Sequence, residues 1–439
     1  MKYLFLLVYA VFVFLMGREV YRLVAGKHGK EAIVGLFMVF TIVPDFMLFD
    51  AYGIPGSFVF VFLFMCLIPI AGIITSGTIR LKFPGQDGLF FGMLFILLLF
   101  ALYTKFVLGV TTDFYGKKLF GYVYNFLIPF LLIRYYQGWI IRSYDKWKMV
   151  LLYAILAYAF KNFSLVGILG FRETYMANYE DLKNVIFAAQ VLAIGVIMCV
   201  YDLFRKYDFK TTVYLGILLV QILLFESRGP LLAAIGAVAI LWWFRPKKNR
   251  VVKRVKSNQL LGISMFLVVI VAGFMAMLTS GQLERIVSKL AMFSSGQVKE
   301  TRAMLYPITL QAISQNMPFG VGFGNSKIAL MRINSFFNND YPHNLVLELI
   351  LEEGIFLAVP IFLFFIKWMK SIFVKDRYSM NTLFFFALYA FAFVCSMVSG
   401  DLVGSRQVFV FGYLAYRSTV YLNSRSMLDL LKQRVRREV

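Results

Sequence analysis

Long apolar runs recur along almost the whole chain and limit what it can fold into. A helix crosses the ~30 Å hydrocarbon layer of a bilayer with about 20 residues. On that basis the sequence predicts about thirteen (12–14) membrane spans, near residues 3–17, 32–49, 57–76, 88–110, 119–137, 149–168, 184–201, 212–225, 229–244, 259–279, 344–366, 381–399 and 407–422. Only 15% of the residues are charged and 60% are hydrophobic, so a soluble globule of 439 residues could not cover its surface. The pattern predicts an all-α polytopic membrane protein and excludes a soluble enzyme, a disordered regulator and a disulfide-stapled secreted domain.

Lysine and arginine are unequally divided between alternate loops. One set of loops (18–31, 77–87, 134–148, 202–211, 245–258, 367–380 and 417–439) carries 30 of the 45, and the opposite set carries 13. Cytoplasmic loops are enriched in these residues, so we place the first set in the cytoplasm, together with the C-terminus. The net charge of +22 is then mainly a topology signal rather than a sign of nucleic-acid binding. The basic run 245–256 also suits anionic lipid headgroups.

One connection is much longer than the others. Residues 280–343 are expected on the periplasmic side, and a connection longer than about 12–15 residues is usually functional or disordered. Within it, Ala303 to Ile313 predicts a helix. We therefore divide the chain into residues 1–279 with ten spans, the loop 280–343 with part of the site, residues 344–422 with three spans, and a basic cytoplasmic tail, 423–439. The first apolar stretch has no small-residue cleavage site and is expected to be a retained span.

Three residues on the expected periplasmic side could carry chemistry. Arg228 lies between two apolar spans, where a charge must be solvated, paired or functional. Arg302 opens the helix predicted in the long loop, and His343 lies at the entrance of the span near 344–366. Taken singly, each has a simpler interpretation: an interfacial anchor for Arg228, a solvated surface charge for Arg302, and an interfacial histidine without a role for His343. Asn344 is suited to capping the following helix.

Acidic residues and glycines follow close by. Glu348 and Glu352 share one helix face, and together with Glu353 they lie deep enough to require cationic partners. The glycines of 320–324 are typical of a tight turn packed at the membrane surface, because the preceding strand and the lysine of a nucleotide-binding loop are missing. We expect no metal and no cofactor, since neither acidic pairs nor histidines have ligand spacing. The cysteines (Cys66, Cys199 and Cys395) are expected to be buried hydrophobes.

In this order, these segments resemble the O-antigen polymerase/ligase superfamily of bacterial inner-membrane glycosyltransferases. The resemblance rests on Glu226–Gly229, Thr301-Arg302, Pro318–Gly324, His343–Glu348 and Glu353-Gly354, and it covers roughly residues 210–370. The family often has glycine before the second arginine, where this chain has Thr301. The resemblance implies a fold similar to multi-spanning glycosyltransferases that use polyprenyl donors, and metal-independent transfer of glycan from undecaprenyl diphosphate.

The same resemblance implies roles for the three residues. Arg228 and Arg302 would bind the diphosphate, because guanidinium groups donate in pairs and stay charged. His343 would accept the proton of the acceptor hydroxyl or orient that hydroxyl. Expected partners are an undecaprenyl-diphosphate-linked oligosaccharide, membrane lipids and a chain-length regulator, with no nucleic acid.

Several functions remain open at this point. We favour a polymerase that joins lipid-linked repeats at the periplasmic face of the inner membrane. A ligase that moves finished polymer onto lipid A core would share its donor and fold. A flippase or other transporter would predict charges along a pathway or two similar halves, and Lys105, Lys161 and Asp45 are scattered. A membrane scaffold would not explain why two arginines and a histidine share one face.

The topology can be tested directly. Single cysteines at Ser257 and Ser295, in a background without the three native cysteines, should lie on opposite sides, because the span 259–279 separates them. An impermeant thiol reagent applied to intact spheroplasts should label position 295 and spare position 257. Labelling of 257 with protection of 295 would place the candidate site in the cytoplasm.

Overall fold

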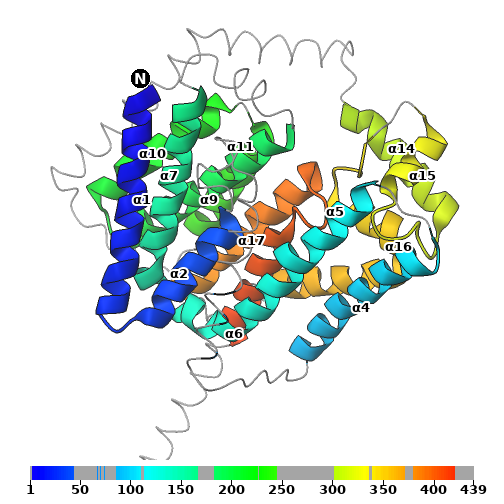
Figure 1. Cartoon of the computed structure of the whole chain (residues 1–439), viewed down its shortest axis with the longest axis horizontal. Helices are drawn as coiled ribbons and strands as arrows, with labels where there is room; N and C mark the ends of the chain where they lie inside the picture. The colour runs from blue at the N-terminus through cyan, green and yellow to red at the C-terminus, as the bar shows by residue number, and fades with distance from the viewer. Residues whose placement is uncertain are drawn as a thin grey trace, which may run out of the picture.

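A computed structural model describes residues 2–43, 67, 70, 74, 86–109, 113–166, 182–225, 227–244, 301–335, 339–370 and 379–420. Every regular element in these ranges is helical (Figure 1). The helices are α1 (Lys2–Ala25), α2 (Gly29–Ile42), α4 (Gln86–Phe106), α5 (Asp113–Gly121), the π-helical turn η2 (Tyr122–Leu127), α6 (Ile128–Arg142), α7 (Tyr144–Val166), α9 (Leu182–Arg205), α10 (Phe209–Leu224), α11 (Arg228–Phe244), α14 (Thr301–Asn316), α15 (Ser326–Ile333), α16 (Leu345–Lys370) and α17 (Met380–Ser399). Residues 406–420 are also helical.

These helices match most of the expected spans. Among the described residues, six are long and apolar enough to cross a membrane: Tyr3–Ala25, Asp87–Phe106, Phe114–Arg142, Val185–Arg205, Leu345–Lys370 and Met380–Ser399. Two shorter apolar helices, Phe209–Leu224 and Gly229–Phe244, fall where the eighth and ninth spans were expected. The span 259–279, most of 57–76 and the tail 423–439 lie outside the described residues. The chain is thus a multi-pass membrane protein.

The first helix is longer than its apolar run indicates. Residues 3–17 predict a short span, but α1 continues to Ala25. The extra turns hold Glu19, which pairs with Arg22 at 2.7 Å and with Arg18 at 3.6 Å. Because these charges neutralise one another along the helix surface, they extend α1 and do not end it.

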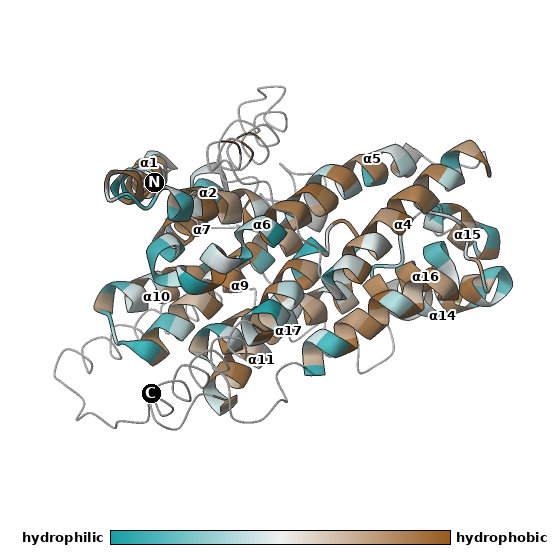
Figure 2. Ribbon diagram, turned by 90° about the horizontal axis from the view of Figure 1, so that it is seen from below, coloured by the Kyte–Doolittle hydropathy of each residue, from teal (hydrophilic) through white to brown (hydrophobic). Residues whose placement is uncertain are grey.

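The helices form two groups that meet along α17. On one side α1, α2, α7, α9, α10 and α11 pack together, and on the other α4, α5, α6 and α16 carry α14 and α15 at one end (Figure 1). Apolar residues cover most of the helix surfaces, as Figure 2 shows. Aromatic rings fill the second group, where Phe90 of α4 lies 5.1 Å from both Phe364 and Trp368 of α16, centroid to centroid. These contacts set α4 and α16 antiparallel, the start of one beside the end of the other.

Polar contacts join three segments that the charge pattern assigns to the cytoplasm. Lys146 lies 3.4 Å from Glu31, Lys148 donates to Asp202 at 2.8 Å, and Arg205 donates in bidentate fashion to Asp145 at 2.6 and 2.8 Å. The hydrogen bonds from Arg205 lower the pKa of the Asp145 carboxyl below its usual value. The segments around residues 31, 146 and 205 therefore lie at one end of the bundle, as an even number of crossings between them requires.

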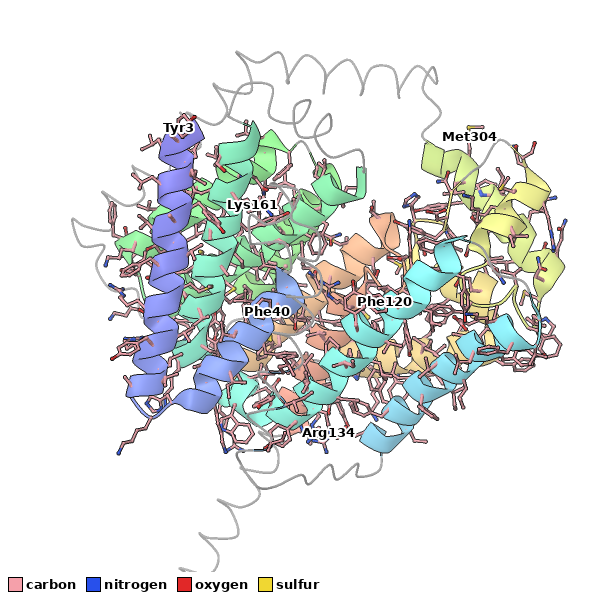
Figure 3. All side chains as sticks on the ribbon, in the orientation of Figure 1. Tyr3, Phe40, Phe120, Arg134, Lys161 and Met304 are labelled. Atoms are coloured by element: carbon pink, nitrogen blue, oxygen red, sulfur yellow. The ribbon has the colours of Figure 1, made fainter. Side chains whose placement is uncertain are left out.

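Buried polar groups lie within the apolar interior. Lys161, expected inside a span, is buried in α7, toward the upper end in Figure 3. Arg134 lies at the lower end, where its side chain is 3.4 Å from the buried Asp87. Cys199 and Cys395 are buried free thiols, as expected, and Cys66 lies outside the described residues.

Candidate functional site

The C-terminal end of α17 is a meeting point for three other helices. The carbonyl of Met397 accepts hydrogen bonds from the Tyr306 hydroxyl of α14 at 3.2 Å and from the Asn344 side chain, just before α16, at 3.0 Å. The first turn of α11 lies beside the next residue, since a Cβ added to Gly229 would be 3.7 Å from Val398. The starts of α11, α14 and α16 therefore approach the same end of α17.

Each residue singled out in the sequence lies at one of these starts. Arg228 is the first residue of α11, Arg302 is the second residue of α14, and His343 comes two residues before α16. The turn expected between the eighth and ninth spans is confirmed, since α10 ends at Leu224. The side chains of Arg228 and Arg302 lie outside the described part of the structure. Free backbone N–H groups and the positive end of the dipole make helix starts favourable to anions.

His343 is held in an unusual backbone conformation. Its φ is +56°, a region that residues with a Cβ seldom occupy. Its ring lies edge-on against buried Tyr341, with centroids 4.5 Å apart. The next residue caps α16 as expected, because the Asn344 side-chain oxygen accepts from the N–H groups of Val346 at 3.0 Å and Leu347 at 3.1 Å. The conformation of the histidine is thus fixed on both sides.

A buried charge cluster lies below the start of α16. The ammonium group of Lys118 in α5 donates to carboxylate oxygens of both Glu348 and Glu352, and all three side chains are almost fully shielded from solvent. The second oxygen of Glu348 accepts from the N–H of Leu402 at 3.0 Å. The expectation of a cationic partner is confirmed for Glu348 and Glu352. It does not hold for Glu353, since neither of its buried carboxylate oxygens has a hydrogen-bond partner among the described residues. Breaking a buried ion pair leaves an uncompensated buried charge, which costs far more than the pair itself contributes.

Glu352 also holds the glycine-rich segment. One of its oxygens accepts from the N–H of Gly324 at 2.7 Å, and the other accepts from the hydroxyl of Ser326 at 2.7 Å and its N–H at 3.4 Å. Nearby, the N–H of Phe323 donates to the Thr104 hydroxyl of α4 at 3.2 Å. The run 320–324 is thus a turn, as expected, and it packs against α16, α4 and α5. Its expected position at the membrane surface stays a prediction.

The glycine-rich segment packs against a break in α16. Gly354 has φ +69° and ψ 178°, which interrupts the helix. The carbonyls of Leu351 and Glu352, which the break leaves without helical partners, accept from the N–H groups of Val321 at 2.8 Å and Gly322 at 3.0 Å. The N–H of Ile355 donates to the carbonyl of Pro318 at 2.9 Å. A Cβ on Gly320 would lie 2.4 Å from the Glu352 carbonyl oxygen. A residue larger than glycine at 320 therefore cannot be accommodated without moving one backbone away from the other.

Comparison with known families identifies the segment that holds these residues. Residues 213–362 match the family described as O-antigen ligase. This segment of the chain is similar to the O-antigen ligase family. This match confirms the resemblance to the O-antigen polymerase/ligase superfamily over a stretch that contains Arg228, Arg302 and His343. A comparison with curated proteins finds no match.

Residues outside the matched segment 213–362 complete its buried network. Lys118, Thr104 and Leu402 all lie beyond residues 213–362, yet they contact Glu348, Glu352 or the glycine-rich segment. In the sequence, Lys118 lies in the short loop between the expected spans 88–110 and 119–137, and nothing beside it indicates a partner. Its position at the edge of the apolar run 119–137 was the available signal, since a lysine there must be paired if the helix is buried.

Loss of the buried ammonium should destabilise the protein. Lys118→Met leaves two carboxylates close together and shielded from water, and breaking a buried pair in this way costs about 3–5 kcal/mol. Lys117→Met is the matched control, because Lys117 is the exposed neighbour in the same helix. Thermal unfolding of the purified protein in detergent should show a clear fall in Tm for the first variant only. Equal Tm values for the two variants would contradict a structural role for the cluster.

Proposed function

We propose that this protein is a polysaccharide polymerase of the O-antigen type. It transfers glycan from undecaprenyl diphosphate to a lipid-linked repeat unit at the periplasmic face of the bacterial inner membrane. The similarity of residues 213–362 to the O-antigen ligase family supports this class of activity, since members of the family are glycosyltransferase-like enzymes that act on lipid-linked glycans. The multi-pass architecture supports a substrate held in a bilayer.

The convergence of three helix starts on the end of α17 carries the proposal. As the bond from the sugar to the diphosphate breaks, negative charge develops on the leaving group. Fixed cations and helix N-termini stabilise such charge most strongly where water is scarce. Arg228 and Arg302 open two of the three helices, and we assign them to the diphosphate.

His343 is assigned to the acceptor. An imidazole can accept a proton near neutral pH, so it suits general-base catalysis on a sugar hydroxyl, or orientation of that hydroxyl. The contact with Tyr341 and the capped helix that follows fix the backbone on both sides of it. Such preorganisation is what a positioned base requires.

A ligase is the second candidate, because the matching family is described as O-antigen ligase and a match to it does not separate the two activities. It would use the same donor with lipid A core as acceptor. Lipopolysaccharide from a deletion strain separates the two: core with one repeat unit indicates loss of a polymerase, and bare core with accumulated lipid-linked polymer indicates loss of a ligase. Membrane lipids and a chain-length regulator are further proposed partners of the polymerase.

Removal of either arginine should abolish polymer formation. Arg228→Ala and Arg302→Ala remove cations that we assign to the diphosphate, and lysine should rescue poorly because it cannot reproduce the bidentate fork. Arg332→Ala is the matched control, an exposed arginine at the end of α15. Polysaccharide ladders at matched membrane expression are the measurement. Near-normal ladders from both Arg228→Ala and Arg302→Ala would remove the diphosphate assignment.

Chelation of divalent cations should leave turnover of the purified enzyme unchanged. The reason is that arginines, and not a metal ion, are proposed to stabilise the diphosphate. The measurement is glycan transfer with and without EDTA. Loss of activity that magnesium or manganese restores would contradict a metal-independent mechanism.

A further inference from the structure

The backbone between α14 and α15 runs deep along α16. We propose that the segment Met317–Asn325 is re-entrant: it lies within the hydrocarbon layer, with Met317 and Phe319 against lipid and the remainder buried or half-buried in protein. The inference rests on the position of this segment along two membrane-spanning helices, on the way its polar groups are satisfied, and on the apolar surface it continues. It does not depend on which side of the membrane the segment enters.

The contact with α16 gives a first measure of how deep the segment lies in the membrane. Its last turn carries Lys367 and Lys370, the basic residues expected at the membrane boundary. At a rise of about 1.5 Å per residue, Ile355 lies about 18 Å from Lys367 along the helix. Its N–H bonds to the carbonyl of Pro318 at 2.9 Å. Pro318 is thus well within the ~30 Å of hydrocarbon measured from that boundary.

The contact with α4 gives a second measure of the depth of the segment. Near its first residue Asp87 pairs with Arg417 at 3.1 Å and Arg134 at 3.4 Å, and this ionic group marks the same end of the bundle, at the bottom of Figure 3. Thr104, which accepts from the N–H of Phe323, lies about 26 Å from Asp87 along the helix. Any tilt of α4 makes the depth along the membrane normal smaller. Both helices therefore place the segment inside the hydrocarbon layer.

Irregular backbone at membrane depth is tolerated only where its polar groups are satisfied within protein. The N–H groups of Val321, Gly322, Phe323 and Gly324 all have partners on α16 or α4. The segment also satisfies a polar group at the break in α16, because the carbonyl of Pro318 accepts a hydrogen bond from the N–H of Ile355, next to Gly354. Two irregular stretches thus complete each other, which is the condition that membrane insertion imposes.

The outer surface of the segment is apolar and joins a lipid-facing stripe. Exposed residues recur every three or four positions on α16, at Phe356, Val359, Leu363 and Ile366. Phe319 is 72% exposed, and its ring centroid is 5.8 Å from that of Phe356, which is 64% exposed. A stripe of this kind on a membrane helix contacts acyl chains, and Phe319 extends it without a break. Hydrocarbon is therefore the occupant that fits this surface.

Site-directed spin labels test the proposal on the full-length protein in liposomes. Cysteines replace Phe319, Leu363 as a lipid-facing reference, and the exposed Ser335 as an aqueous reference, in a background without native cysteines. Power saturation compares collisions with oxygen, which partitions into lipid, and with a water-soluble nickel chelate. Position 319 should match 363, with an oxygen-to-nickel collision ratio several-fold higher than at 335.

A label at 319 that behaves like the one at 335 overturns the proposal. Met317→Cys provides a second, independent probe if the Phe319→Cys variant does not fold, and it should give the same lipid-like ratio. The measurement needs no substrate and no turnover. If the glycosyltransferase assignment failed, these collision ratios would be unchanged. If the re-entrant segment failed, the polysaccharide ladders expected of the arginine variants would be unchanged.

Discussion

The carboxylate of Glu352 is the interaction on which the rest of this region depends. It accepts from Lys118, from the N–H of Gly324, and from both the N–H and the hydroxyl of Ser326. Through Lys118 it shares a cation with Glu348, which in turn binds the backbone at Leu402. Three segments far apart in sequence, around Lys118, Gly324–Ser326 and Leu402, are thereby fixed around α16. Because the group is shielded from water, a missing partner could not be replaced by solvent.

Hydropathy was sufficient for most of the fold, because membrane spans are determined by composition and length. The helix expected at Ala303–Ile313 is confirmed within α14, and the cap at Asn344 is confirmed by two hydrogen bonds. Local chemistry decides features of this kind. The predicted end of the first span, at residue 17, was wrong, since α1 continues to Ala25. Arg18, Glu19 and Arg22 neutralise one another on the helix, an effect that a hydropathy window does not include.

The candidate site was less accessible to sequence reasoning. The chain places Arg228, Arg302 and His343 at helix starts, which capping and turn signals indicate, but their approach to one point depends on the end of α17. There a backbone carbonyl, that of Met397, accepts from both Tyr306 and Asn344. Every residue has a backbone carbonyl, so the residue type does not show which carbonyl accepts hydrogen bonds from distant side chains. The partner of Glu348 and Glu352 was missed for a related reason: each pair joins residues more than two hundred positions apart.

That separation has a consequence for biogenesis. Lys118 precedes Glu348 by 230 residues, so at a synthesis rate of roughly 5–20 residues per second it waits on the order of ten seconds or longer for its counter-charge. Until then the ammonium group near the start of the apolar helix Phe114–Arg142 has no counter-charge, and a charge is least costly at the membrane interface. The nascent α5 therefore favours the lipid–water interface until α16 emerges from the ribosome. Pairing of α5 with α16 is therefore a late step that follows insertion of the first spans.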